Sequence, residues 1–137
     1  MILLDTHVLL WLAEDEARLG KRTREIIASS AAAGNVAVSA ISFWEIGMLL
    51  SKNRIGLVVS LADFAEAVAD KQAFKVIPVD SKIAVETANL PRGIHRDPAD
   101  RMLIATARHL TCPLATTDSR ILAYSAEGHV RTLDASS

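Results

Sequence analysis

The sequence predicts an α/β fold, a three-layer α/β/α sandwich around a central parallel sheet. The strand-like segments are only four or five residues long and largely apolar, which is typical of strands covered on both faces. Helical segments separate them, as right-handed crossover connections between parallel strands require. No repeat, linker or low-complexity stretch interrupts this alternation, so residues 1–137 are expected to form a single domain.

The predicted elements follow one another in a regular order. Strands are expected at residues 2–5, 35–39, 75–79, 113–117 and 130–133. Helices are expected at residues 6–15, 20–34, 40–53, 61–74, 81–90, 98–110 and 118–128. Gly34 is expected to end the second helix, and Pro98 suits the first turn of the sixth. The segment RIGLVVS, residues 54–60, is ambiguous and is best interpreted as a loop.

Composition is that of an intracellular globular protein. Half of the residues are hydrophobic and 23% are charged, which argues against disorder. The apolar runs are too short to span a bilayer, and no basic segment typical of a signal peptide opens the chain. The single cysteine, Cys112, cannot form an internal disulfide, so the cytoplasm is the expected compartment. A formal net charge of −1 means that a nucleic-acid partner would need a local basic patch.

Two aspartates follow predicted strands, at the edge where open parallel sheets bind their ligands. Asp5 ends the first strand within the otherwise apolar MILLDTHVLLWL, and Asp118 directly follows the fourth strand, PLATT. Each can equally be the N-cap of the helix that comes next. The hydroxyls of Thr116 and Thr117 can either cap that helix or orient a neighbouring carboxylate.

Glu45 is the only charged residue in ISFWEIGMLLS and shares a helical face with Met48 and Leu49. Buried glutamates are rare unless they are paired or bound. Two interpretations are open. If the helix begins at Ser42, then Ser42 and Glu45 form a capping box. If it begins just after Ser39, Glu45 points into the protein and a functional role is favoured.

Asp97 and Asp100 flank Pro98 and Ala99 in RDPADR, at the start of the sixth predicted helix. Asp97 suits the N-cap, and Asp100 lies where the helix dipole favours a carboxylate. Either side chain could also reach a metal ion in front of the helix. The residues alone do not decide between these roles.

The acids are more informative as a set than singly. Several carboxylates that converge on one cavity repel one another, so they favour a bound cation. Hard oxygen ligands suit Mg²⁺ or Mn²⁺, whereas zinc prefers nitrogen or sulfur. Mg²⁺ held by a few carboxylates is the usual device for phosphate chemistry. The set therefore predicts a metal-dependent site.

Four motifs resemble those of the PIN domain, specifically the small VapC-like toxins of bacterial toxin–antitoxin pairs. The opening strand with its aspartate is ILLDTHVLLWL, and the helix with its glutamate is SAISFWEIG. The third motif is DRMLIATA and the fourth is ATTDSRI. One subgroup carries HRDPFDR at the third site, where this chain has HRDPADR with Ala99 in place of the aromatic residue. The resemblance spans nearly the whole chain.

The resemblance implies an Mg²⁺- or Mn²⁺-dependent endoribonuclease toxin, neutralised by an antitoxin whose tail occupies the active-site groove. It also implies a homodimer. The implied catalytic and metal-binding residues are Asp5, Glu45, Asp100 and Asp118. Asp97, Thr6 and Thr116 are accessory candidates, and the predicted RNA contacts are Arg96, Arg101 and Arg120, in a basic set that also includes Arg92, Lys52 and Arg54.

Other side chains are expected to have structural roles. His7 is predicted to point away from the acids along its helix, and Trp11, Phe43 and Trp44 to lie in the core or a dimer interface.

Two alternatives of other classes are open. One is a phosphatase-type hydrolase, although that class needs a second aspartate where this chain has His7. The other is a non-catalytic RNA- or protein-binding module with a degenerate PIN-like fold, in which the acids only cap helices. Metal titration separates this second alternative from a nuclease, because a binding module is expected to ignore Mg²⁺.

Overall fold

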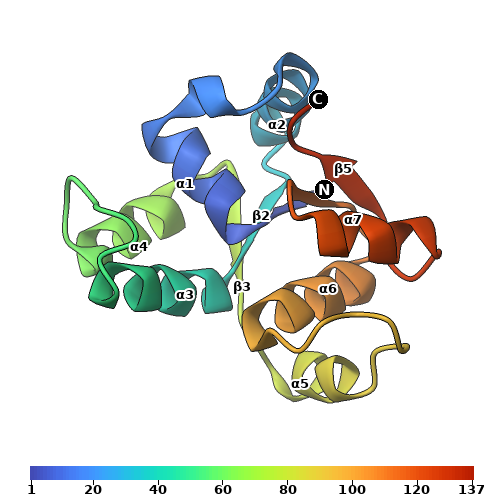
Figure 1. The fold of residues 1–137 in the computed structure, drawn as a ribbon. Helices are drawn as coiled ribbons and strands as arrows, with labels where there is room; N and C mark the ends of the chain where they lie inside the picture. The colour runs from blue at the N-terminus through green and yellow to red at the C-terminus, as the bar shows by residue number, and fades with distance from the viewer.

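The computed structural model describes residues 1–137 and contains five strands that alternate with helices (Figure 1). The strands are β1 (Ile2–Leu4), β2 (Val36–Ser39), β3 (Phe74–Ile77), β4 (Leu114–Thr116) and β5 (Thr132–Asp134). The α-helices are α1 (Thr6–Glu14), α2 (Lys21–Ala32), α3 (Ala40–Ser51), α4 (Leu61–Asp70), α5 (Ser81–Ala88), α6 (Pro98–Leu110) and α7 (Ser119–Ala126). A short 3₁₀ helix, η1 (Glu16–Arg18), follows α1.

All strand pairs are parallel, in the order β3-β2-β1-β4-β5. The chain moves outward from β1 to β2 and β3, and then returns to the other side of β1 with β4. The order therefore changes direction between β1 and β4. Side chains that follow these two central strands lie beside the point where such sheets usually bind ligands.

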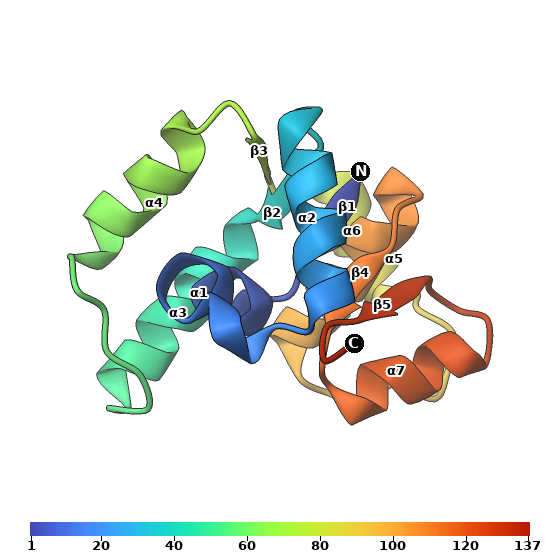
Figure 2. The same ribbon diagram turned by 90° about the horizontal axis from the view of Figure 1, so that it is seen from above.

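Helices cover both faces of the sheet, which confirms the predicted three-layer fold. Ile2 and Leu4 belong to one buried cluster, with side chains of α1 to α4, and Leu3 belongs to another, with side chains of α5 to α7. This alternation along β1 follows from the two-residue period of a strand. Figures 1 and 2 show the two helical layers on opposite sides of the sheet. No helix has the combined length and apolar character that a bilayer span needs.

The elements match the sequence-based expectations closely but not everywhere. Residues 54–60 form no regular element, as expected. The helix expected at 61–74 ends at Asp70, because Lys71 has an extended backbone and Phe74 already pairs with Val36. The third strand ends at Ile77, just before Pro78, whose ring nitrogen has no hydrogen to donate to a strand ladder. The 3₁₀ helix η1 was not predicted.

Gly20 supports a contact between the start of α2 and the end of the described chain. Its amide donates to the Ala135 carbonyl at 3.0 Å, and the Ser137 oxygen accepts from the Thr23 amide, also at 3.0 Å. Both figures place the C-terminal end beside α2. A Cβ atom on Gly20 would clash with the backbone of Ser137 and lie 2.6 Å from the Ser136 oxygen.

Gly20→Ala is therefore expected to lower the free energy of unfolding by about 1–3 kcal/mol, the usual cost of forcing extra atoms into a packed site. Urea denaturation followed by circular dichroism measures this difference. Gly56→Ala is the matched control, because no atom lies within 4 Å of a Cβ atom built there. Equal stability of the two variants would contradict the close contact.

Candidate metal centre

Five carboxylates line one cleft of about 410 Å³, on the side where β1 and β4 end. They belong to segments that are far apart in the chain: the end of β1, the middle of α3, the start of α6 and the residue before α7. The acidic lining residues are Asp5, Glu45, Asp97, Asp100 and Asp118. The structure thus brings together all four predicted catalytic acids and the accessory Asp97.

Asp5 is held at both carboxylate oxygens. Oδ1 accepts the Thr6 amide at 2.7 Å, which makes Asp5 the N-cap of α1, and Oδ2 accepts the Thr116 hydroxyl at 2.6 Å. Thr116 ends β4, and its hydroxyl oxygen also accepts the amide of Asp118 at 3.0 Å. The hydroxyl of Thr116 therefore connects the carboxylate of Asp5 to the backbone of Asp118. Both roles considered for Asp5 are compatible, because the cap fixes the side chain at the cleft.

Asp118 caps α7 through Oδ1, which accepts the amides of Arg120 at 2.8 Å and Ile121 at 3.1 Å. Its Oδ2 lies 3.4 Å from the Arg120 guanidinium. Burial raises the pKa of Asp118, but these hydrogen bonds and the Arg120 charge outweigh burial and leave the pKa below its usual value. Asp118 is therefore kept ionised more readily than Asp5, Glu45 or Asp100, whose pKa values are raised.

Helix α3 begins directly after Ser39, whose hydroxyl accepts the amide of Ile41 at 3.2 Å. This start excludes the capping box of Ser42 and Glu45, because Ser42 is already inside the helix. The Ser42 hydroxyl instead accepts the Thr6 hydroxyl at 3.0 Å, which ties α1 to α3. Glu45 is thereby free to face the cleft, where its Oε1 is buried without a hydrogen-bond partner.

Asp97 and Asp100 begin α6 as the sequence suggested. Asp97 is the N-cap, and its Oδ1 accepts the amide of Asp100 at 2.9 Å. Asp100 is buried, and its Oδ2 lies 2.6 Å from Nε2 of His95, a pairing that the sequence analysis did not identify. The only available signal was that His95 opens the HRDPADR motif.

The buried acids of the cleft resist ionisation when no cation is present. Burial is the main cause that raises the pKa of Asp5, of Glu45 and of Asp100, the last to about 6. Neighbouring carboxylates add to the effect, since the charge of Asp5 raises the pKa of both Glu45 and Asp100. Hydrogen bonds from Thr116 and Thr6 oppose burial at Asp5 without overcoming it.

The donor set fits a divalent cation bound by oxygen. Ligand oxygens of Glu45, Asp97 and Asp100 lie within 4.8 Å of one another, and Asp5 and Asp118 line the same cleft. A cation there would give the buried Oε1 of Glu45 the partner that it lacks and would offset the carboxylate repulsion. Oxygen ligands without cysteine favour a hard ion of the Mg²⁺ type.

Cationic side chains lie at the same cleft. Lys52, Arg54 and Arg120 are among its lining residues, and all three are exposed. The other two predicted RNA contacts are placed differently. Arg96 is exposed but does not line the cleft, and the Arg101 guanidinium donates to the Thr87 carbonyl of α5 at 3.2 Å.

One expectation about a neighbouring side chain is wrong, and one of two alternatives for another is excluded. His7 does not point away from the acids: it lines the cleft, and its charge lowers the pKa of Asp5 and of Glu45. Of the two places expected for Trp44, the core is excluded, because 55% of Trp44 is exposed and it lines the same cleft. A dimer interface stays a prediction. An apolar sequence run does not reveal this exposure, since α3 buries Ile46 on one face only and leaves Trp44 on another.

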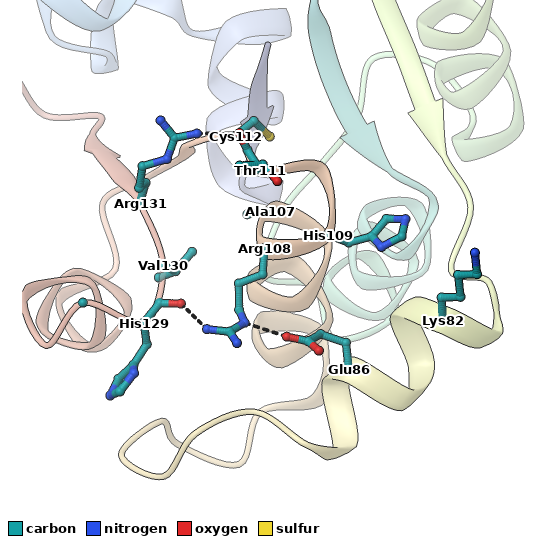
Figure 3. A pocket seen from close by; sticks show the side chains of 11 residues that line it. Lys82, Glu86, Ala107, Arg108, His109, Thr111, Cys112, His129, Val130 and Arg131 are labelled. Atoms are coloured by element: carbon teal, nitrogen blue, oxygen red, sulfur yellow. Dashed lines mark hydrogen bonds and ion pairs between the residues drawn. The ribbon is translucent and has the colours of Figure 1, made fainter.

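A larger hollow of about 540 Å³ lies elsewhere, at the carboxyl end of α6 (Figure 3). Its arginines already have partners within the protein. Arg108 donates to Glu86 at 2.6 Å and to the His129 carbonyl at 2.5 Å, and Arg131 donates to the Thr111 carbonyl. The carboxyl end of a helix also disfavours anions. Both arginines are therefore used in contacts within the protein, and the carboxylate cleft is the better candidate site.

Comparison with known proteins agrees with this geometry. The family model of the PIN domain matches residues 2–127. Ribonuclease VapC22 of Mycobacterium tuberculosis (strain ATCC 25618 / H37Rv) is 30% identical over 120 residues, which cover 88% of each chain. Among solved structures, DNA-bound VapBC from Salmonella typhimurium has a TM-score of 0.66 at 17% identity, over 97% of this chain and 96% of that one. A toxin–antitoxin complex from Klebsiella pneumoniae has a TM-score of 0.57 at 18% identity, over 87% and 88%.

The chain belongs to the PIN domain family. The resemblance to VapC-like proteins that the four motifs predicted is confirmed by the curated relative, and the structural neighbours agree in fold.

Proposed function

We propose that this protein is an Mg²⁺- or Mn²⁺-dependent endoribonuclease, the toxin of a toxin–antitoxin pair, which hydrolyses phosphodiester bonds of RNA in the cytoplasm. The name of the related ribonuclease supports the reaction, and the toxin–antitoxin complex among the structural neighbours supports the partner. The observation that carries the proposal is the buried, unpartnered Oε1 of Glu45 among acids that resist ionisation.

Asp5, Glu45, Asp100 and Asp118 are the proposed metal ligands, and Asp97 is a further donor close to Glu45 and Asp100. A bound divalent ion supplies charge neutralisation at the phosphate and lowers the pKa of a coordinated water.

The chain prepares the ligands for this role. Thr116 and the Thr6 amide orient the carboxylate of Asp5, and the first amides of α7 keep Asp118 ionised. Helix α3 directs Glu45 toward the same point because Ser39 sets its start. The fixed positions of these groups reduce the reorganisation that the reaction needs.

Binding of RNA is proposed to depend on local cations, because the chain as a whole is slightly acidic. Arg120 is the best placed of the predicted contacts, since it lines the cleft beside Asp118, and Lys52 and Arg54 line it as well. These side chains can hold phosphates that flank the cleaved bond. Arg96 can assist from outside the cleft, whereas Arg101 is occupied by the carbonyl of Thr87.

The cleft is also the proposed site of inhibition, where the tail of a cognate antitoxin would exclude RNA. The further proposal is a homodimer. Trp44 and Met48, which are 55% and 37% exposed, both line the cleft and give α3 an apolar surface that a second copy can cover.

Cleavage of end-labelled RNA tests the proposed reaction. Purified protein is expected to produce discrete fragments with Mg²⁺ or Mn²⁺ and none with excess EDTA, and Asp5→Asn is expected to lower the rate by roughly 100-fold or more. The matched control is Asp70→Asn, which changes an exposed acid at the end of α4. Undiminished cleavage by Asp5→Asn, or cleavage that persists in EDTA, would refute this function. Failure to bind either ion would favour the non-catalytic binding module.

A further inference from the structure

His95 lies in the loop between α5 and α6 and contacts Asp100, one of the acids that line the carboxylate cleft. Its side chain is 15% exposed, and its Nε2 lies 2.6 Å from Oδ2 of Asp100. The other ring nitrogen, Nδ1, is buried and has no hydrogen-bond partner. His95 does not line the cleft itself, so it reaches the site only through Asp100.

This arrangement determines which nitrogen donates. An ionised carboxylate only accepts hydrogen bonds, so Nε2 must carry the hydrogen atom that points at Oδ2. A hydrogen on Nδ1 would instead be a buried donor without an acceptor, which is costly. Nε2 is therefore the donor, and its hydrogen bond fixes Oδ2 of Asp100.

Fixing one oxygen orients the other. A carboxylate can rotate about its terminal torsion, whose energy profile is broad. At Asp100 the Nε2 contact restricts that rotation, and Oδ1 is left for a ligand. The comparable case in this cleft is Asp5, whose carboxylate is held by Thr116 and by the Thr6 amide.

We propose that His95 is a positioning residue, which donates from Nε2 to Asp100 and holds its carboxylate in the orientation that binds a divalent cation together with Glu45. The inference rests on the proposed metal-dependent function. Partners that orient metal ligands typically change metal affinity by 10–100-fold when they are removed. His95 thus acts through Asp100 and need not touch RNA.

Metal affinity measured by calorimetry with Mn²⁺ alone tests this role without reference to activity. His95→Ala is expected to weaken Mn²⁺ binding by about 10–100-fold. His95→Gln is expected to restore most of the affinity, because the glutamine amide nitrogen can donate from nearly the position of Nε2. His109→Ala is the control, since His109 is exposed and lines the other hollow.

The outcomes separate this inference from the proposed function. If wild-type protein binds Mn²⁺ and cleaves RNA but His95→Ala binds the ion equally well, only the positioning role is overturned. An equal loss in the alanine and glutamine variants would also overturn it, because it would indicate packing rather than a donated hydrogen bond. Absence of Mn²⁺ binding by the wild type would overturn both.

Nuclear magnetic resonance of ¹⁵N-histidine-labelled wild-type protein without metal provides a second test that needs no variant. The expected spectrum shows the His95 hydrogen on Nε2, with the downfield proton shift of a short hydrogen bond to a carboxylate. A hydrogen on Nδ1 alone would overturn the inference, even if the alanine variant failed to fold.

Discussion

Replacing Asp100 with asparagine is expected to lower RNA cleavage by roughly 100-fold or more while it stabilises the metal-free protein. The two effects have one cause. Asp100 is buried near other carboxylates, and its pKa is raised to about 6 by burial first and by the charges of Asp5 and Asp97 in addition. At pH 7.5 its negative charge therefore opposes folding unless a cation is bound.

Asparagine has the same shape without the charge, and its oxygen can still accept from Nε2 of His95. A raised pKa of this size corresponds to about 1–3 kcal/mol, which is the gain expected in the free energy of unfolding. Urea denaturation in EDTA measures it, and a parallel assay with Mg²⁺ measures cleavage. Asp70→Asn should change neither quantity. Lower stability of Asp100→Asn in EDTA would show that the negative charge of Asp100 does not destabilise the folded protein.

The fold was largely predictable because its elements are determined locally. In α6, the N-cap Asp97 and the proline after it specify the same first residue that the structure has. The short apolar strands need only nearest-neighbour patterns to be recognised. The strand order β3-β2-β1-β4-β5 was not predicted, since it depends on pairing between distant segments.

The candidate site was predictable in its residues but not in its contacts. Asp5, Glu45 and Asp118 are conspicuous because each is an acid beside or within an apolar run. The hydrogen bond from Thr116 to Asp5 joins residues 111 positions apart, and no local pattern specifies it. The same holds for the exposure of Trp44, which depends on where neighbouring helices pack.

Metal-free protein is expected to lose stability as the pH rises from about 4 to about 7. The folded-state pKa of Asp100 is about 6, above its ordinary value of 3.8, so between these values the folded state binds more protons than the unfolded state. The stability that Asp100 contributes is therefore fully present below pH 3.8 and is lost as the pH rises through about 6. Asp5 and Glu45, also with raised pKa values, act in the same direction. Asp118 and Asp134 have lowered pKa values and oppose this trend only at lower pH, where they become protonated.

Mn²⁺ is expected to reverse this loss at pH 7.5 and to have little effect at pH 4.5, because protonated carboxylates do not bind the ion. At 100 times its dissociation constant, an ion that binds only the folded state stabilises it by about 3 kcal/mol, a shift of several degrees in Tm. Thermal unfolding across this pH range, with EDTA or with Mn²⁺, measures both effects. The variant Asp5→Asn/Asp100→Asn should show a flatter profile and little response to Mn²⁺, because it lacks two of the buried charges. If the Tm of the metal-free wild type instead rose steadily from pH 4 to pH 7, the acids would be stabilised by neighbours within the chain, and the need for a cation in this cleft would disappear.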